Sequence, residues 1–256
     1  YFDQYGIIRD VMQNHLLQIL ALVAMDAPLS LDADAVRNAK VALLRQVPAV
    51  TLDRLAVGQY GPTLRDGTML SGYMQEEGVP ADSRTPTYAA AVLRIENSRW
   101  RGVPFLMEAG KALDERVNEI RISFRAAKPN LFEPVHGSLP ANELVVRIQP
   151  DEAITLKIMN KTPGLAMRLV PAALDLRYQT AFGEVIPGAY ERLLLDVIQG
   201  DRGLFIRADE LAAAWDVFTP ALHALETQRV QPVRYQIGAV RPAEASALAR
   251  RAGVAL

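Results

Sequence analysis

His15 is the residue in this sequence best suited to proton transfer near neutral pH, because an unperturbed imidazole has a pKa of about 6.5. It lies in the stretch GIIRDVMQNHLLQ, residues 6–18. Apolar residues recur there at three- and four-residue spacing, which predicts an amphipathic helix from about Gln4 to Ala24. His15 lies at the edge of that apolar stripe, beside a row of polar residues (Asp10, Asn14 and Gln18). Two roles fit this position: a buried histidine with satisfied hydrogen bonds, or a base that faces a cleft.

Asp10 is the carboxylate that precedes His15 in the same predicted helix. Five residues of regular α-helix place two side chains about 140° apart around the axis, so direct contact between them is awkward. If His15 is a base, the carboxylate that orients it therefore comes from elsewhere. Asp10 then has a separate task, such as accepting hydrogen bonds from ligand hydroxyls.

A second group of polar residues lies around the strands predicted in the middle of the chain. Lys111 and Arg116 flank a short turn between two of these strands, and Gln149 ends another strand directly before Pro150. All three residues fit exposed surface positions. They also fit a site for an anionic or polyhydroxyl ligand, since cations and an amide bind such groups.

Several chemistries are excluded or disfavoured by residue content. The sequence has no cysteine, which excludes disulfides, thiolate metal sites and a cysteine nucleophile. The three histidines (His15, His136 and His223) lie far apart and form no metal-binding motif, so no metal is predicted, and we expect His136 to lie in a solvated loop. No glycine-rich dinucleotide-binding turn or Walker motif is present, so no coenzyme-binding residue is assigned.

Composition indicates a globular protein. The 256 residues are 50% hydrophobic and 22% charged, with a net charge of −1. No basic cluster interleaved with aromatic residues is present, which argues against a nucleic-acid partner. No apolar run is long enough for a membrane span, and the first residues do not form a signal peptide. We therefore expect a cytoplasmic location, and the initial tyrosine suggests a chain cut from a longer one.

The order of elements predicts an α+β fold. Helices are expected at both ends of the chain, with Asp32 or Asp34 as the N-cap of the second helix. Between them lie short segments of period-two alternation, such as EIRISFR and ELVVRIQ, which predict a large, mainly antiparallel sheet covered on one side. The glycine- and proline-rich stretch from about Gly58 to Pro86 is expected to be a surface loop.

Long stretches of the sequence resemble the C-terminal domain of the glucose-6-phosphate dehydrogenase family. These are GIIRDVMQNHLLQ, RWRGVPFLMEAGKALDERVNEIRISFR, NELVVRIQPDEAI, AYERLLLDVIQGD and LFIRADELAAAWDVFTP. Their order and spacing match along nearly the whole chain. The resemblance implies a single substrate-binding and oligomerisation domain over residues 1–256, with helices on one face of its sheet and a coenzyme domain missing upstream.

The resemblance also implies a function and a role for each candidate residue. Family members oxidise glucose 6-phosphate to 6-phosphogluconolactone with NADP as hydride acceptor, the first step of the oxidative pentose phosphate pathway. His15 corresponds to the general base and Asp10 to a residue that binds sugar hydroxyls. Lys111, Arg116 and Gln149 correspond to positions that bind the sugar phosphate. In the family this sheet also meets a second subunit, so the resemblance implies a homodimer or homotetramer through the sheet.

Departures from the family pattern set further expectations. The coenzyme turn, a substrate-gripping motif and the aspartate that orients the base are absent from this sequence, so we expect the chain by itself to be inactive. The alternative is a non-catalytic sugar-phosphate-binding or scaffolding module with the same fold.

Some members also bind a structural NADP on this domain. Three cations match that site: Arg121, Arg147 and Lys157. Glu108 and Val117 replace cations there, so no structural NADP is expected.

Overall fold

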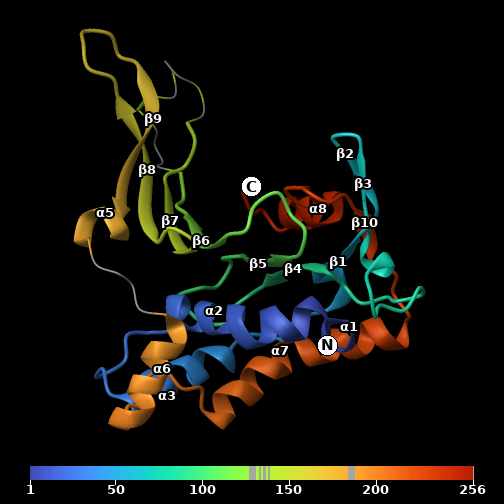
Figure 1. The fold of residues 1–256 in the computed structure, drawn as a ribbon. Coiled ribbons are helices and arrows are strands. Elements are labelled where there is room, and N and C mark those ends of the chain that lie inside the picture. Colours follow the sequence, from blue (N-terminus) through green and yellow to red (C-terminus); the bar gives the residue numbers. More distant parts are fainter. Residues whose placement is uncertain (127–130, 133, 135–136, 138, 184–187, 256) are drawn as a thin grey trace. The chain divides into compact units, whose positions relative to one another are not determined.

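This computed structural model describes residues 1–126, 131, 132, 134, 137, 139–183 and 188–255 (Figure 1). His136, predicted to lie in a solvated loop, is outside the described residues. The chain divides into two compact units. The first unit comprises Tyr1–Asp114 with Ala189–Leu256, and the second comprises Glu115–Gly188.

The first unit contains the helices predicted at both ends of the sequence. Its helical elements are α1 (Phe2–Ile7), η1 (Ile8–Leu16), α2 (Leu17–Ala24), α3 (Ala33–Leu44), η2 (Leu52–Arg54), η3 (Tyr73–Gln75), α6 (Ala189–Gln199), α7 (Ala208–Thr227) and α8 (Ala243–Arg251). Asp32 caps α3, as one of the two predicted alternatives, since its side chain accepts a hydrogen bond from the backbone N–H of Ala35 at 2.9 Å.

A four-stranded sheet forms the centre of the first unit, in the order β10-β1-β4-β5. Its strands are β10 (Val233–Tyr235), β1 (Leu55–Tyr60), β4 (Tyr88–Leu93) and β5 (Phe105–Gly110), while β2 (Thr63–Arg65) and β3 (Thr68–Leu70) form a separate hairpin. Every residue of β4 is buried. Its side chains alternate between two apolar clusters, one that includes α2, α3 and α7 and another that includes α8. Figure 1 shows these helices on opposite sides of the sheet.

The second unit consists mainly of an antiparallel sheet in the order β6-β7-β8-β9. Its elements are β6 (Asn118–Ser123), β7 (Glu143–Gln149), β8 (Ala153–Lys161), β9 (Leu169–Arg177) and the short helix α5 (Tyr178–Phe182). All of its strand pairs are antiparallel and join consecutive strands. This meander agrees with the period-two alternation in the sequence.

The α+β class is therefore confirmed, with two differences in detail. The predicted strands are divided between two four-stranded sheets, and helices pack on both faces of the first sheet rather than on one. Part of the expected loop from Gly58 to Pro86 is instead strand β1, buried beside β10. A Cβ on Gly58 would lie 3.0 Å from the Tyr235 ring, so the glycine that suggested a loop permits close packing of two strands. Within the described residues, no helix has both the length and the apolar character to cross a bilayer.

Candidate active site

His15 lies near the end of η1 and its side chain is exposed. The alternative of a buried histidine is therefore wrong. The apolar stripe around it is buried as predicted, with Ile8 and Met12 at 1% and 0% exposure. His15 thus projects from a helix whose opposite side is fixed in the core, an arrangement that suits a base which must reach a ligand.

η1 is a π-helix, in which backbone hydrogen bonds join residues five apart. The N–H of Leu17 closes this segment on the carbonyl of Met12. Such turns are rare in proteins and occur frequently at functional sites. The expectation of one regular α-helix from Gln4 to Ala24 is therefore wrong over Ile8–Leu16, and also at Gly6, whose backbone is not helical.

The π-helical geometry changes the relation between Asp10 and His15. The two residues are five apart, which is the spacing that one π-helical turn brings toward the same side of the helix. The argument that they diverge by about 140° holds only for an α-helix. Asp10 is half-buried and His15 is exposed, so both side chains are accessible from solvent.

Lys111 directly follows β5 and its side chain is exposed. Its Nζ lies 4.1 Å from the centroid of the Phe2 ring, within the range of a cation–π interaction. Its backbone is also fixed: the N–H donates to Thr87 O at 2.9 Å, and the carbonyl accepts from the Tyr235 hydroxyl at 2.7 Å. Lys111 therefore lies against α1, the short helix that precedes the segment carrying Asp10 and His15 and is separated from it by a kink at Gly6 (φ 69°).

Arg116 and Gln149 belong to the second unit, and both are exposed. Gln149 is the last residue of β7 and pairs with Asn118, the first residue of β6. Arg116 lies two residues before Asn118, so Arg116 and Gln149 are at the same end of this strand pair. Lys111 and Arg116 flank the turn between β5 and β6, as predicted.

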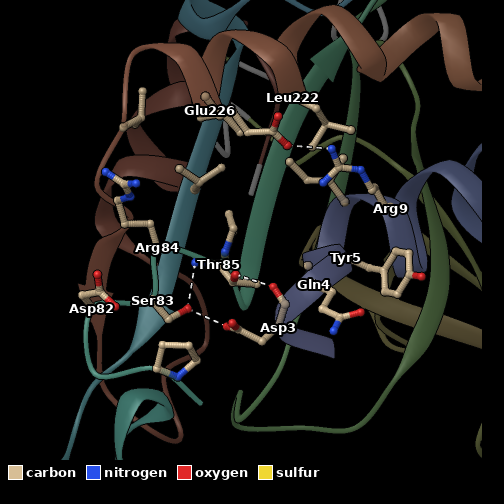
Figure 2. Close-up of a pocket in the computed structure, with 17 residues that line it drawn as sticks. Asp3, Gln4, Tyr5, Arg9, Asp82, Ser83, Arg84, Thr85, Leu222 and Glu226 are labelled. Atoms are coloured by element: carbon tan, nitrogen blue, oxygen red, sulfur yellow. Dashed lines mark hydrogen bonds and ion pairs between the residues drawn. The ribbon is translucent and has the colours of Figure 1, made fainter. Parts of the chain in front are cut away.

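Figure 2 shows a pocket of about 430 Å³ in the first unit, lined by residues of α1, η1, α7 and the segment before β4. Arg9 of η1 and Glu226 of α7 form an ion pair of 2.7 Å at this pocket, and Ser83 donates to Asp3 at 2.5 Å. None of the five predicted site residues lines it. This pocket therefore does not coincide with the predicted site, but it shares the η1 segment with it.

Arg121, Arg147 and Lys157, the three cations that the resemblance singled out, are engaged in ion pairs. Lys157 lies 2.7 Å from Glu143, which lies 3.6 Å from Arg121, and Glu119 is paired with both Arg121 and Arg147. In the first unit, Glu108 accepts hydrogen bonds from Tyr88 and from both Nε and Nη2 of Arg241. Each of these three cations therefore already has a carboxylate partner, although the two carboxylates offset only two of the three positive charges. The described residues show no cluster of potential metal ligands.

Several residues that shape the site were not predicted from the sequence. Phe2 supports Lys111, Trp215 bonds to the π-helix, and Gln13 is a buried amide within the apolar side of η1. A glutamine between Met12 and Asn14 carried a weak signal, since it interrupts the apolar stripe. Phe2 and Trp215 carried none, because their contacts join distant parts of the sequence.

Comparison with known proteins identifies the family. Residues 1–255 match the model of the glucose-6-phosphate dehydrogenase C-terminal domain. The chloroplastic glucose-6-phosphate 1-dehydrogenase of Nicotiana tabacum is 54% identical over 254 residues, covering 98% of this chain and 43% of that protein. The enzyme of the same name from Dictyostelium discoideum is 49% identical over 254 residues, covering 99% of this chain and 50% of that protein.

Solved structures agree with this result. A glucose-6-phosphate dehydrogenase in complex with its substrate glucose 6-phosphate has a TM-score of 0.92 and 44% sequence identity, covering 100% of this chain and 52% of that one. Glucose-6-phosphate 1-dehydrogenase from Mycobacterium avium has a TM-score of 0.81 and 34% identity, covering 96% and 50% of the two chains. The chain thus spans about half the length of the relatives it matches. It belongs to the family of glucose-6-phosphate dehydrogenase C-terminal domains.

Proposed function

We propose that this chain is the C-terminal portion of a glucose-6-phosphate 1-dehydrogenase, which oxidises glucose 6-phosphate to 6-phosphogluconolactone in the oxidative pentose phosphate pathway. The observation that carries the proposal is the exposed imidazole of His15 on a π-helical turn, in a chain of this family. NADP, when bound by a part of the protein outside this chain, accepts the hydride from C1 of the sugar.

His15 acts as general base in this proposal. The hydroxyl group on C1 loses its proton to the imidazole while the C–H bonding pair leaves C1 as hydride, and a carbonyl forms at C1. An exposed imidazole suits this step because it can reach a ligand hydroxyl and accept its proton. Asp10 accepts hydrogen bonds from sugar hydroxyls on the same side of η1.

Lys111, Arg116 and Gln149 bind the sugar phosphate in this proposal. Lys111 and Arg116 offer cationic donors and Gln149 an uncharged amide, and all three side chains are exposed. Replacing either cation by alanine in the full-length protein should raise KM for glucose 6-phosphate with a smaller effect on kcat. A selective loss of kcat with unchanged KM contradicts the binding role.

The central test is His15→Asn in the full-length protein, assayed by NADPH formation. Loss of the base should lower kcat by roughly 10²- to 10⁴-fold while the affinity for glucose 6-phosphate stays within about threefold. His223→Asn is the matched control, because His223 is also an exposed histidine on a helix of the first unit. Full turnover in His15→Asn contradicts the base assignment. Sugar-phosphate binding without turnover in the wild-type protein favours the non-catalytic alternative.

The chain alone is expected to be inactive, because its sequence contains no glycine-rich turn for a dinucleotide. Purified residues 1–256 should not reduce NADP in the presence of glucose 6-phosphate. Measurable turnover contradicts this expectation. Calorimetry on the full-length protein tests the related expectation that no structural NADP binds at Arg121, Arg147 and Lys157.

Assembly and compartment are part of the proposal. We expect a homodimer or homotetramer through the second sheet, whose polar face presents Glu119, Arg121, Glu143, Arg147 and Lys157, and we expect a cytoplasmic location. Arg121→Glu should weaken the assembly, as measured by sedimentation velocity at low salt. An unchanged oligomer, or a monomeric wild-type protein, contradicts this interface.

A further inference from the structure

The π-helical turn of η1 requires support from outside the helix. Hydrogen bonds between residues five apart are rarely sustained in proteins, and the residues of η1 include good α-helix formers such as Met12 and Leu16. Tertiary contacts must therefore favour the π-helical form over the α-helical one. η1 packs against α7 and β5.

Trp215 of α7 makes two reciprocal hydrogen bonds with η1. Gln13 Nε2 donates to the carbonyl oxygen of Trp215 at 3.2 Å, and Trp215 Nε1 donates to Asn14 Oδ1 at 3.2 Å. One residue of α7 thus engages the two residues that directly precede His15. A third contact, the ion pair of Arg9 with Glu226, fixes the start of η1 to the same helix (Figure 2).

We propose that Trp215, acting through Gln13 and Asn14, is a positioning residue that holds the π-helical turn and thereby keeps His15 on the same side of the helix as Asp10. This inference rests on the proposed function of His15 as general base. Trp215 touches neither the sugar nor the coenzyme in this scheme. It acts only through the backbone that carries His15.

The burial of Gln13 makes its hydrogen bond to α7 costly to break. Gln13 is 2% exposed, so its amide has little access to water, and a shift of η1 away from the backbone carbonyl of Trp215 would leave a buried donor unpaired. Relaxation of η1 to an α-helix would turn His15 away from Asp10 by the larger angle expected for that helix. Even a displacement of about 1 Å in a reacting group can reduce turnover by about 10²-fold.

The test compares two tryptophan-to-phenylalanine variants of the full-length protein. Trp215→Phe removes the indole N–H but keeps an aromatic ring. Trp100→Phe is the matched control, because Trp100 Nε1 donates to Ala24 O at 2.8 Å, at the far end of the same helical segment. Gln13→Met is a second variant that removes the other hydrogen bond while filling a similar volume.

Trp215→Phe and Gln13→Met should each lower kcat by roughly 10- to 100-fold, with KM for glucose 6-phosphate within about twofold, whereas Trp100→Phe should retain kcat. Arg9 and Glu226 still fix the part of η1 nearest Asp10, which is why KM is expected to change little. Unchanged kcat in both Trp215→Phe and Gln13→Met overturns the proposal. An equal loss in Trp100→Phe also overturns it, because the effect would then be general destabilisation.

A second measurement separates this proposal from the proposed function. Crystal structures of the wild-type protein and Trp215→Phe report directly whether the Leu17 N–H still bonds to Met12 O. If the wild type is inactive, the proposed function fails, and the structures alone decide the role of Trp215. A π-helical turn that persists without the indole N–H overturns that role.

Discussion

The two four-stranded sheets of this protein differ sharply in how they are buried. In the first sheet, β4 is buried along its whole length, between helices on both faces. In the second sheet, Val145 is the only buried residue of the four strands. The strand sequences reflect this difference, because YAAAVL of β4 is apolar throughout, whereas ELVVRIQ of β7 includes charged and polar residues on one face.

The register of the second sheet sorts its side chains into two unlike faces. One face carries rows of apolar residues across all four strands: Ile122, Leu144, Leu156 and Leu174 in one row, and Ile120, Val146, Ile154 and Leu176 in the next. The other face carries the ion pairs of Glu119 and Glu143. An apolar face of this extent marks a surface that packs against something else. Helices of the first unit cover its sheet, whereas the apolar face of the second sheet stays partly exposed, with Leu174 at 60% and Leu176 at 40%.

The largest expected difference is the loss of stability on breaking a buried ion pair compared with an exposed one. Lys40 and Glu210 lie 2.6 Å apart with side-chain exposures of 7% and 0%, whereas Lys157 and Glu143 lie 2.7 Å apart with exposures of 48% and 21%. Glu210→Ala leaves a buried lysine unpaired and should reduce the free energy of unfolding by about 3–5 kcal/mol. Glu143→Ala should cost no more than about 1 kcal/mol. Urea denaturation of the full-length variants measures both, and equal losses would contradict the contrast.

A pair of leucines tests the same contrast with apolar groups. Leu93 of β4 is 1% exposed and Leu174 of β9 is 60% exposed. Leu93→Ala should destabilise by about 2–5 kcal/mol, because it leaves a cavity in a packed core. In the chain alone, Leu174→Ala should cost less than about 1 kcal/mol. A much larger loss for Leu174→Ala in the full-length protein than in the chain alone would show that the apolar face is covered there.

A smaller effect on stability concerns a cluster of buried tyrosines in the first unit, of which Tyr235 donates a hydrogen bond to Lys111 O. Burial raises the pKa of Tyr235 to about 12, and burial also raises the pKa values of Tyr60, Tyr73 and Tyr88. Because the fold favours the neutral phenol, this stability is fully present below about pH 10, the usual pKa of tyrosine, and is lost as the pH rises toward 12.

Tyr235→Phe should therefore reduce, but not abolish, the decrease in unfolding free energy between pH 9 and 12. Chemical denaturation across this range measures the slope, with the exposed Tyr190→Phe as control. An unchanged slope in Tyr235→Phe would mean that its hydroxyl titrates normally in the folded state.

The sequence predicted most of the elements that surround the site. The helices around His15, Asp32 and Trp215, and the six strands from β4 to β9, follow from apolar periodicity, which reflects burial of one side of an element. Strands β1 and β10 were missed. β10 has only three residues and follows Pro232, and β1 contains Gly58. Only the pairing of β1 with β10 and with β4 makes them strands.

His15 shows most clearly which properties of the site the sequence predicts and which depend on the tertiary structure. Residue types and spacing determined that an imidazole lies at the edge of an apolar stripe, and the resemblance assigned it a role. Only the tertiary structure shows that imidazole exposed on a π-helical turn, and it brings Trp215 and Glu226 of α7 to Asn14 and Arg9 of that turn from more than 200 residues away along the chain. Local periodicity records which side of a helix is buried. It does not record hydrogen bonds from a distant helix, and those contacts set the turn on which the candidate base lies.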